Sequence, residues 1–216
     1  MSVTKKRSGD KTNLLVSRIR DSIISGEMPP GSPLRQETLA ASYRLSRVPI
    51  REALRTLETE GLVQLVPNKG AIVAPIDLEE LREIYEMRDA AETLALKLSI
   101  PEMSNTQIDI AQNIQNEMIK CNDKDICALN RKFHEALYLP SKRKRLLAHI
   151  SCLHDIAERY LRFTLKNLDY VERSAGEHAA LLKACRKRDS SSAIKILSSH
   201  ITQAGKELEE FLKANL

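Results

Sequence analysis

The residues that interrupt helices are concentrated in the first third of the chain. Six of the eight prolines and five of the seven glycines fall before residue 76, which leaves two of each for residues 76–216. Proline cannot continue a helix, and glycine destabilises its interior. The sequence therefore predicts a mainly α protein of two domains, a compact module over residues 1–75 and an all-α helical bundle over residues 76–216.

Positive charge is divided along the chain in the same way. Residues 1–75 contain 12 Lys/Arg and 7 Asp/Glu, whereas residues 76–216 contain 22 of each, so the first domain accounts for the whole net charge of +5. No run approaches the roughly 18 apolar residues that a membrane helix needs. The first nine residues also lack the apolar stretch of a secretory signal. We therefore expect a cytoplasmic protein without a membrane partner.

Hydrophobic spacing and turn residues predict three helices in the first domain. The first helix ends before the turn at residues 29–31, and a short second helix runs to about Tyr43. The third begins after Ser46, a residue type that often caps helix N-termini, and runs to Glu60. Two helices joined by a short turn, preceded by another helix, are typical of DNA-binding modules.

The third helix has two distinct faces. One is an apolar stripe formed by Ile50, Ala53, Leu54 and Leu57. Elsewhere three arginines recur every four residues and form a basic ridge: Arg47, Arg51 and Arg55. One face therefore packs into a core and the other faces an acidic partner.

Two short β-rich runs follow this helix. Residues 62–66 and 71–73 flank the Pro-Asn-Lys-Gly turn at residues 67–70, as in a β-wing. Three helices and a wing form the layout of a winged helix-turn-helix, whose recognition helix enters the DNA major groove. A ridge of merely solvated arginines would leave the wing and the charge asymmetry unexplained. The residues predicted to contact double-stranded DNA are Arg35, Arg44, Ser46, Arg47, Arg51, Arg55, Lys69 and Gly70.

The same domain resembles the GntR family of bacterial transcription regulators over nearly all of residues 12–75. The resemblance rests on Gly26, Pro30-Gly31, Leu34, Leu39-Ala40, Ser46-Arg47, Pro49-Ile50-Arg51-Glu52-Ala53-Leu54, Leu57, Glu60-Gly61-Leu62-Val63, Pro67, Gly70 and Val73. It implies that Arg47 and Arg51 reach bases or phosphates and that Gly70 lets the wing approach the minor groove. Arg44 departs from the family, which usually has a small glycine-like residue in this turn. Because two-fold symmetry matches palindromic sites, we expect a homodimer on an inverted-repeat operator.

The sequence of the second domain predicts about six helices. The pattern places them at residues 78–98, 105–121, 125–138, 142–168, 171–187 and 191–214. A bundle of this size could serve as a dimerisation scaffold alone. Its functional interpretation therefore depends on polar residues on inward faces.

The histidines of the bundle are candidate metal ligands. Asn130 and His134 are four apart and share one helix face, and His178 and His200 lie among apolar residues. A single histidine on an apolar face is usually a hydrogen-bonded core residue. Imidazoles from three helices, with the amide oxygen of Asn130 as a weaker fourth ligand, suit Zn²⁺ or Ni²⁺ better than Mg²⁺ or Ca²⁺. The two weaker candidates are His149 and His154.

The bundle resembles the FCD ligand-sensing domain of the FadR subfamily of GntR regulators over about residues 78–212. The resemblance rests on Glu86-Met87-Arg88, on residues 130–134, on His178 and on His200. In metal-binding members, an Asp or Asn is followed four residues later by His and then by two later histidines. The resemblance therefore implies that Asn130, His134, His178 and His200 hold a metal, with one negative charge fewer than an Asp would supply.

An ion held by neutral ligands keeps its full charge and favours an anionic guest. We therefore expect a small carboxylate metabolite as the effector, clamped by Arg88, Arg159 and Arg162. The alternative role of these arginines is in ion pairs with residues such as Glu92 and Glu158.

The leading hypothesis is a DNA-binding transcriptional regulator, a repressor, whose bundle senses a small acid. One alternative keeps the regulator but leaves the bundle metal-free, with a larger ligand such as an acyl thioester. A three-histidine metalloenzyme is the rival from another class. It is disfavoured because His134-Glu135 lacks the second histidine of an HExxH motif and because the basic module would be unexplained.

Overall fold

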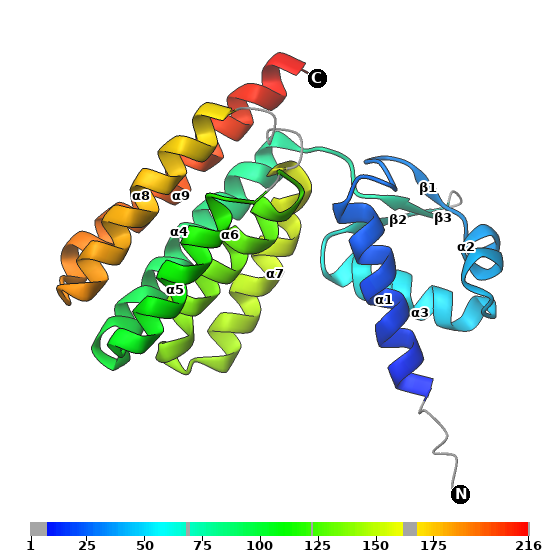
Figure 1. The fold of residues 1–216 in the computed structure, drawn as a ribbon. Coiled ribbons are helices and arrows are strands. Elements are labelled where there is room, and N and C mark those ends of the chain that lie inside the picture. The colour runs from blue at the N-terminus through cyan, green and yellow to red at the C-terminus, as the bar shows by residue number, and fades with distance from the viewer. Residues whose placement is uncertain (1–7, 68–69, 122, 162–167, 216) are drawn as a thin grey trace, which may run out of the picture. The chain divides into compact units, whose positions relative to one another are not determined.

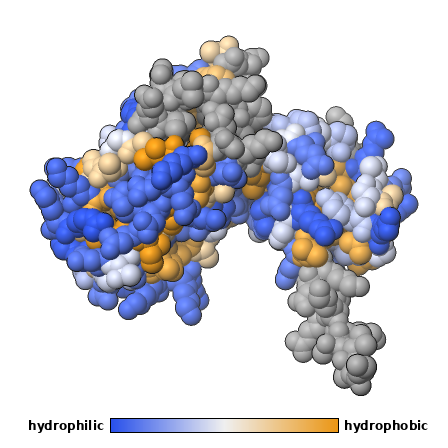
Figure 2. Space-filling view, viewed as in Figure 1, coloured by the Kyte–Doolittle hydropathy of each residue, from blue (hydrophilic) through white to orange (hydrophobic). Residues whose placement is uncertain are grey.

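The computed structural model describes residues 8–67, 70–121, 123–161 and 168–215. The chain is mainly helical, as predicted, and divides into two compact units, Met1–Ile76 and Asp77–Leu216 (Figure 1). None of the described helices combines the length and the apolar character of a membrane span. Hydrophilic side chains cover most of the visible face of each unit, and hydrophobic side chains show in patches among them (Figure 2).

The first unit contains helices and a small antiparallel sheet. Its elements are α1 (Ser8–Ile24), β1 (Pro33–Leu34), α2 (Gln36–Tyr43), α3 (Arg47–Thr59), β2 (Val63–Val66) and β3 (Gly70–Val73). Strands β2 and β3 form the predicted wing, with Val63 opposite Val73 and Val66 opposite Gly70. Strand β1 was not predicted; it pairs with the other side of β3, which gives the strand order β1-β3-β2.

The apolar stripe of α3 lies in the core of this unit. Its four predicted members, Ile50, Ala53, Leu54 and Leu57, are at most 1% exposed. They belong to one hydrophobic cluster with buried residues of α1 and the sheet. An ion pair also joins the two helices, because the Arg20 guanidinium donates to both carboxylate oxygens of Glu60. The recognition helix is therefore held rigidly from its buried side.

The turn between α2 and α3 takes an unusual backbone conformation. Arg44 ends α2 at φ 53° and ψ 45°, and its N–H donates to the carbonyls of Ala40 and Ala41. This left-handed conformation costs a non-glycine residue roughly 1 kcal/mol, which explains why a glycine-like residue suits the position. Ser46 occupies the N-cap position of α3 with extended backbone, but its side chain makes no capping hydrogen bond.

The second unit is a helical bundle. Its described helices are α4 (Leu78–Ser99), α5 (Asn105–Met118), α6 (Asp123–Tyr138), α7 (Lys144–Leu161), α8 (Leu168–Arg186) and α9 (Ser190–Asn215), with 3-10 turns η1 (Ile100–Glu102) and η2 (Leu139–Ser141). Helix α4 packs against α6, α7 and α9, and α5 packs against α6 and α8. The six predicted helices are confirmed to within a few residues, although residues 162–167 of the predicted fourth helix lie outside the described ones.

Candidate DNA-binding surface and metal centre

The arginine ridge of α3 is exposed. Arg47, Arg51 and Arg55 all lie on the surface, whereas the apolar stripe of the same helix is buried. The Arg47 guanidinium Nη2 lies 2.9 Å from Glu37 Oε1 on α2, and both side chains are largely exposed. Exposed ion pairs contribute little to stability, so a phosphate group can replace Glu37 as the partner of Arg47.

The other predicted DNA contacts lie on the surface of the same unit. Arg35, Arg44 and Ser46 are exposed at the two ends of α2 and before α3. Gly70 begins β3 with φ +86°, a conformation that glycine adopts without the steric cost of a side chain. Lys69 lies outside the described residues.

One exposed apolar residue of α3 was missed by sequence reasoning. Val48 is 63% exposed and directly follows Arg47. Its signal was an apolar side chain at the start of the recognition helix but outside the apolar stripe. An apolar side chain in this place can contact the methyl group of thymine in the major groove.

Three of the predicted metal ligands meet inside the bundle. His134 on α6, His178 on α8 and His200 on α9 are buried, and their potential ligand atoms all lie within 4.8 Å of one another. Of the two weaker candidates, His149 is exposed and His154 is buried. The ring centroids of His134 and His154 are 6.3 Å apart.

Each imidazole of this cluster is held through its Nδ1 atom. His134 Nδ1 lies 3.1 Å from the hydroxyl of Tyr138, His178 Nδ1 lies 2.7 Å from Gln115 Oε1, and His200 Nδ1 lies 2.6 Å from Glu177 Oε2. Gln115 Oε1 and the Glu177 carboxylate can only accept. The Tyr138 hydroxyl donates to Glu92 Oε2 at 2.7 Å, so its oxygen is left to accept from His134. All three Nδ1 atoms therefore carry a proton, so Nε2 is the nitrogen of each ring that a metal would use.

The free nitrogens have the properties of metal ligands. Nε2 of His134 and Nε2 of His178 are buried without a hydrogen-bond partner among the described residues. Burial lowers the pKa of His134 well below its usual value, and neighbouring His178 and His200 lower it further. Burial and His200 lower the pKa of His178 in the same way. Because a metal binds the neutral imidazole, the residues present fit a divalent ion.

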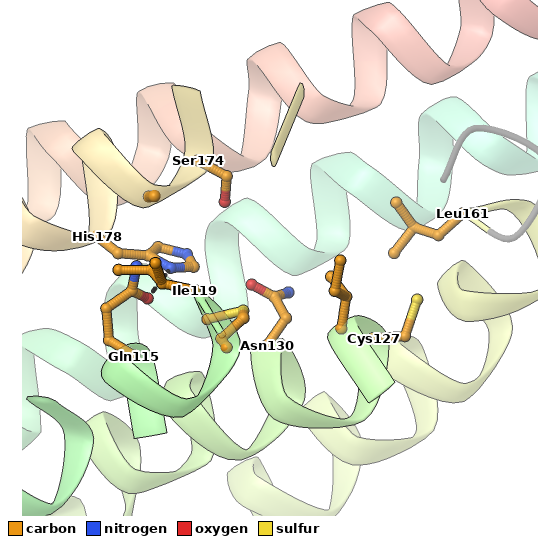
Figure 3. A pocket seen from close by; sticks show the side chains of 10 residues that line it. Gln115, Ile119, Cys127, Asn130, Leu161, Ser174 and His178 are labelled. Atoms are coloured by element: carbon orange, nitrogen blue, oxygen red, sulfur yellow. Dashed lines mark hydrogen bonds between the residues drawn. The ribbon is translucent and has the colours of Figure 1, made fainter. Parts of the chain in front are cut away.

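Asn130 lies beside this cluster. It lines a cavity of about 40 Å³ with His178, Gln115, Ser174 and a set of apolar residues, and its amide points into the cavity between His178 and Leu161 (Figure 3). The apolar part of the lining comprises Met118, Ile119, Ile126, Cys127, Leu161 and Ala175. A smaller cavity of about 20 Å³ shares Asn130 and also borders Arg88 and His154.

Arg88 forms an ion pair with Glu92, which was the alternative expectation to its role as an effector clamp. It is 5% exposed, and its Nε donates to Glu92 Oε1 at 2.8 Å. His154 Nε2 lies 3.0 Å from the same oxygen. Burial alone would raise the pKa of Glu92, but Arg88 and His154 outweigh it and hold that pKa well below its usual value. The side chain of Arg159 and all of Arg162 lie outside the described residues.

Sequence reasoning missed the residues that orient the imidazoles. They are Glu92, Gln115, Tyr138 and Glu177. Glu92 carried a usable signal, because a carboxylate between Ala91 and Ala95 on an apolar helix face needs a buried partner. The others have polar side chains of ordinary spacing.

Comparison with known proteins matches each of the two units to a protein family. The family described as "Bacterial regulatory proteins, gntR family" matches residues 12–73, and the FCD domain matches residues 83–203. The regulator YdhC of Bacillus subtilis is 29% identical over 205 residues, which cover 91% of this chain and 90% of that one. The repressor RspR of Escherichia coli K12 is 22% identical over 201 residues, covering 91% and 88%.

A solved structure supports the same assignment. The crystal structure of a GntR family transcriptional regulator from Pseudomonas syringae pv. tomato DC3000 matches with a TM-score of 0.60 and 30% identity, covering 98% of this chain and 90% of that one. These relatives are transcriptional regulators rather than enzymes. The chain therefore belongs to the GntR family of bacterial transcriptional regulators, with a winged helix-turn-helix DNA-binding domain and an FCD domain.

Proposed function

We propose that the protein is a repressor that binds a palindromic operator as a homodimer and is controlled by a small carboxylate bound at a metal ion in the FCD domain. One observation carries the sensing half of this proposal. Three buried imidazoles converge, each held through Nδ1, and two of their Nε2 atoms lack a partner among the described residues. A buried nitrogen without a partner is costly, so the cluster is built for a ligand.

His134, His178 and His200 would hold the ion, with Asn130 as a weaker fourth ligand. A set of imidazole nitrogens favours Zn²⁺ or Ni²⁺ over ions that prefer oxygen. The ion would supply positive charge and an open coordination position in a buried site. An anionic oxygen is the ligand that this charge favours, because the protein ligands are neutral.

The cavity beside the cluster indicates what the rest of the effector is like. About 40 Å³ is room for only a few water-sized groups, which favours a small molecule over an acyl thioester. Apolar residues form most of the wall next to Asn130, so the body of the carboxylate would be apolar. Arg88 borders the adjoining cavity and stays in the proposed clamp, with Arg159 and Arg162.

The DNA-binding half of the proposal rests on the exposed ridge of α3. Arg47, Arg51 and Arg55 would place positive charge in the major groove, and Arg35, Arg44, Ser46, Lys69 and Gly70 would contact the surrounding backbone or minor groove. Neutralising several phosphates implies an affinity loss of order 10³-fold between about 50 and 200 mM salt. Repression is supported by the relative RspR, which is a transcriptional repressor.

The test combines metal analysis with ligand screening. Protein purified without a histidine tag is expected to carry close to one divalent ion per chain by mass spectrometry. Its melting temperature should rise with carboxylates of about three to six carbons, because a ligand that binds only the folded state stabilises it. The same acid should change operator affinity in fluorescence anisotropy. Chelated protein is the control, and an equal thermal shift without metal would contradict the proposed sensor.

A further inference from the structure

A buried serine in the wall of the cavity beside the histidine cluster has no partner in the protein. Ser174 on α8 is 7% exposed, lines this cavity, and forms no hydrogen bond with another described residue. Its hydroxyl points into the cavity, as does the amide of Asn130 on α6 (Figure 3). Burying a hydroxyl without a hydrogen-bond partner is costly. The molecule that fills the cavity should therefore supply a polar group at this place.

Ser174 and Asn130 each lie one turn before a histidine of the cluster. Ser174 precedes His178 by four residues on α8, and Asn130 precedes His134 by four residues on α6. Residues four apart lie one above the other on the same helix face. A ligand that reaches from an ion at the histidines into the cavity would therefore meet a hydroxyl from one helix and an amide from another.

The charges around the cavity disfavour a second carboxylate on this ligand. None of the described residues that line the cavity is a lysine or an arginine. Two arginines border the adjoining cavity. Arg88 pairs with Glu92, and Arg131 pairs with both Asp155 and Glu135. A second carboxylate would have to leave water and then compete with protein carboxylates for these arginines.

A purely apolar body is disfavoured for the opposite reason. It would cover the Ser174 hydroxyl and the Asn130 amide with carbon atoms, and both groups would be buried without a partner. A neutral hydroxyl avoids both costs, because it carries no charge and can donate one hydrogen bond and accept another. The rest of the wall is mostly apolar, so a single hydroxyl on an otherwise apolar body suits this cavity.

We infer that Ser174 is a specificity-determining residue of the effector site, and that it selects a hydroxy acid over the same acid without its hydroxyl. This selection rests on the proposed function, because it presupposes a carboxylate bound at the histidine cluster. The Ser174 hydroxyl would bond to the effector hydroxyl, with the Asn130 amide beside it. An analogue that lacks the hydroxyl would be rejected because it leaves these buried groups unpaired.

Four-carbon acids that differ in one group test this selection. The full chain loaded with Zn²⁺ is titrated calorimetrically with butanoate, succinate, and both enantiomers of 2-hydroxybutanoate and 3-hydroxybutanoate. We expect at least one hydroxybutanoate to bind about 10-fold or more tightly than butanoate, since an unpaired buried polar group costs roughly this factor in affinity. Succinate should bind more weakly than that hydroxybutanoate, because its second carboxylate meets no uncommitted cation.

The variant Ser174→Ala tests whether the serine causes the preference. Its affinity for the preferred hydroxybutanoate should fall to within about threefold of its affinity for butanoate, because no serine hydroxyl is left to pair. A 2-hydroxy acid can also chelate the ion through its hydroxyl, which would produce a preference without the serine. A preference that persists undiminished in Ser174→Ala would therefore come from the ion and contradict the role of Ser174.

The matched control is Ser191→Ala on α9. Ser191 is exposed and does not line the cavity, so this variant should keep the full preference for the hydroxy acid. Melting temperature and metal content, measured on both variants, establish that each one folds and carries the ion. A folded Ser174→Ala protein that no longer binds Zn²⁺ would place the serine in the metal site and count against selection of the effector.

The outcomes distinguish this selection from the proposed function. If the Zn²⁺-loaded chain binds none of the acids, the carboxylate sensor itself is wrong. If butanoate or succinate binds as tightly as every hydroxybutanoate, the sensor stands and the selection by Ser174 is wrong. If the preference is lost in Ser174→Ala and kept in Ser191→Ala, Ser174 is the residue that reads the hydroxyl.

Discussion

The winged unit and the bundle present their functional groups in opposite physical states. Arg47, Arg51 and Arg55 are charged and exposed, so they already interact with water and exchange it for phosphate. His134 and His178 are buried and neutral, and their rings are held by other side chains before any ligand arrives. The first surface therefore acts through charge, whereas the second acts through the orientation of buried groups. Substitutions should therefore affect the two units independently.

The largest expected effect is on metal binding. His178→Ala removes one of the three nitrogens, and we expect the metal affinity to fall by more than about 100-fold. Substituting a residue that only orients a ligand already lowers metal affinity by roughly 10–100-fold. Operator affinity should stay within about twofold, because the core of the winged unit is separate. Calorimetric titration and anisotropy measure the two quantities. His149→Ala, an exposed histidine, is the control. A loss of operator binding in folded His178→Ala would break the separation of the units.

The reciprocal substitution lies on the recognition helix. Arg51→Ala should weaken operator binding by about 1–3 kcal/mol if its guanidinium reads a base edge, and should relax the preference at one operator position. Arg55→Ala should be milder, and metal content should be unchanged in both. Binding to a panel of operators with single base changes is the measurement. Unchanged affinity in a folded Arg51→Ala dimer would show that another face of α3 reads the DNA.

Acid should act on the bundle through its imidazoles. The folded pKa values of His134 and His178 lie well below the usual 6.5, so the unfolded chain binds more protons once the pH falls below about 6.5. The metal-free chain should therefore lose stability as the pH falls from about 7.5 to 5.5. Glu92, with its lowered pKa, stabilises the fold above the usual carboxyl pKa of 4.5, and this contribution is lost only in stronger acid.

Denaturant unfolding of the metal-free chain at several pH values measures the slope of the free energy of unfolding against pH. His178→Gln should flatten it, because one imidazole that must stay neutral has been removed. If the stability of His178→Gln depended on pH as steeply as that of the unaltered chain, the acid effect would come from other groups.

The smallest expected effect concerns the turn before α3. Arg44→Gly relieves the left-handed conformation and should stabilise the winged unit by about 0.5–1 kcal/mol. It also removes one positive charge, so the salt dependence of operator binding should fall by about one unit of slope. Arg35→Ala removes a charge at an ordinary backbone conformation and serves as the control. Equal stability changes in the two variants would argue against backbone strain at Arg44.

Much of the fold could be predicted because its signals are local. The helices follow from hydrophobic spacing and scarce breakers, and the wing follows from two short β-rich runs around a turn. Strand β1 could not be predicted, because two residues, Pro33 and Leu34, carry no pattern, and the strand exists only through pairing with β3. Its formation depends on a contact between segments far apart in the sequence.

The candidate site, too, could be predicted from the sequence only in part. The convergence of His134, His178 and His200 was predicted and is found, whereas their ligation of a metal stays a prediction. Two of the partners of their Nδ1 atoms, Gln115 and Glu177, were not predicted because each lies on another helix than its histidine, and the contact depends on how the helices pack. Arg88 could be placed in an ion pair with Glu92, since the two are four residues apart on α4.

The three imidazoles come from α6, α8 and α9, which are separate stretches of the chain. An ion bound by all three would act as a cross-link between them, restricting the unfolded chain as a disulfide does. Unlike a disulfide, this link can be withdrawn by chelation and needs no oxidant. The metal supply would then set how long the regulator survives cellular proteases, in addition to how it responds to its effector.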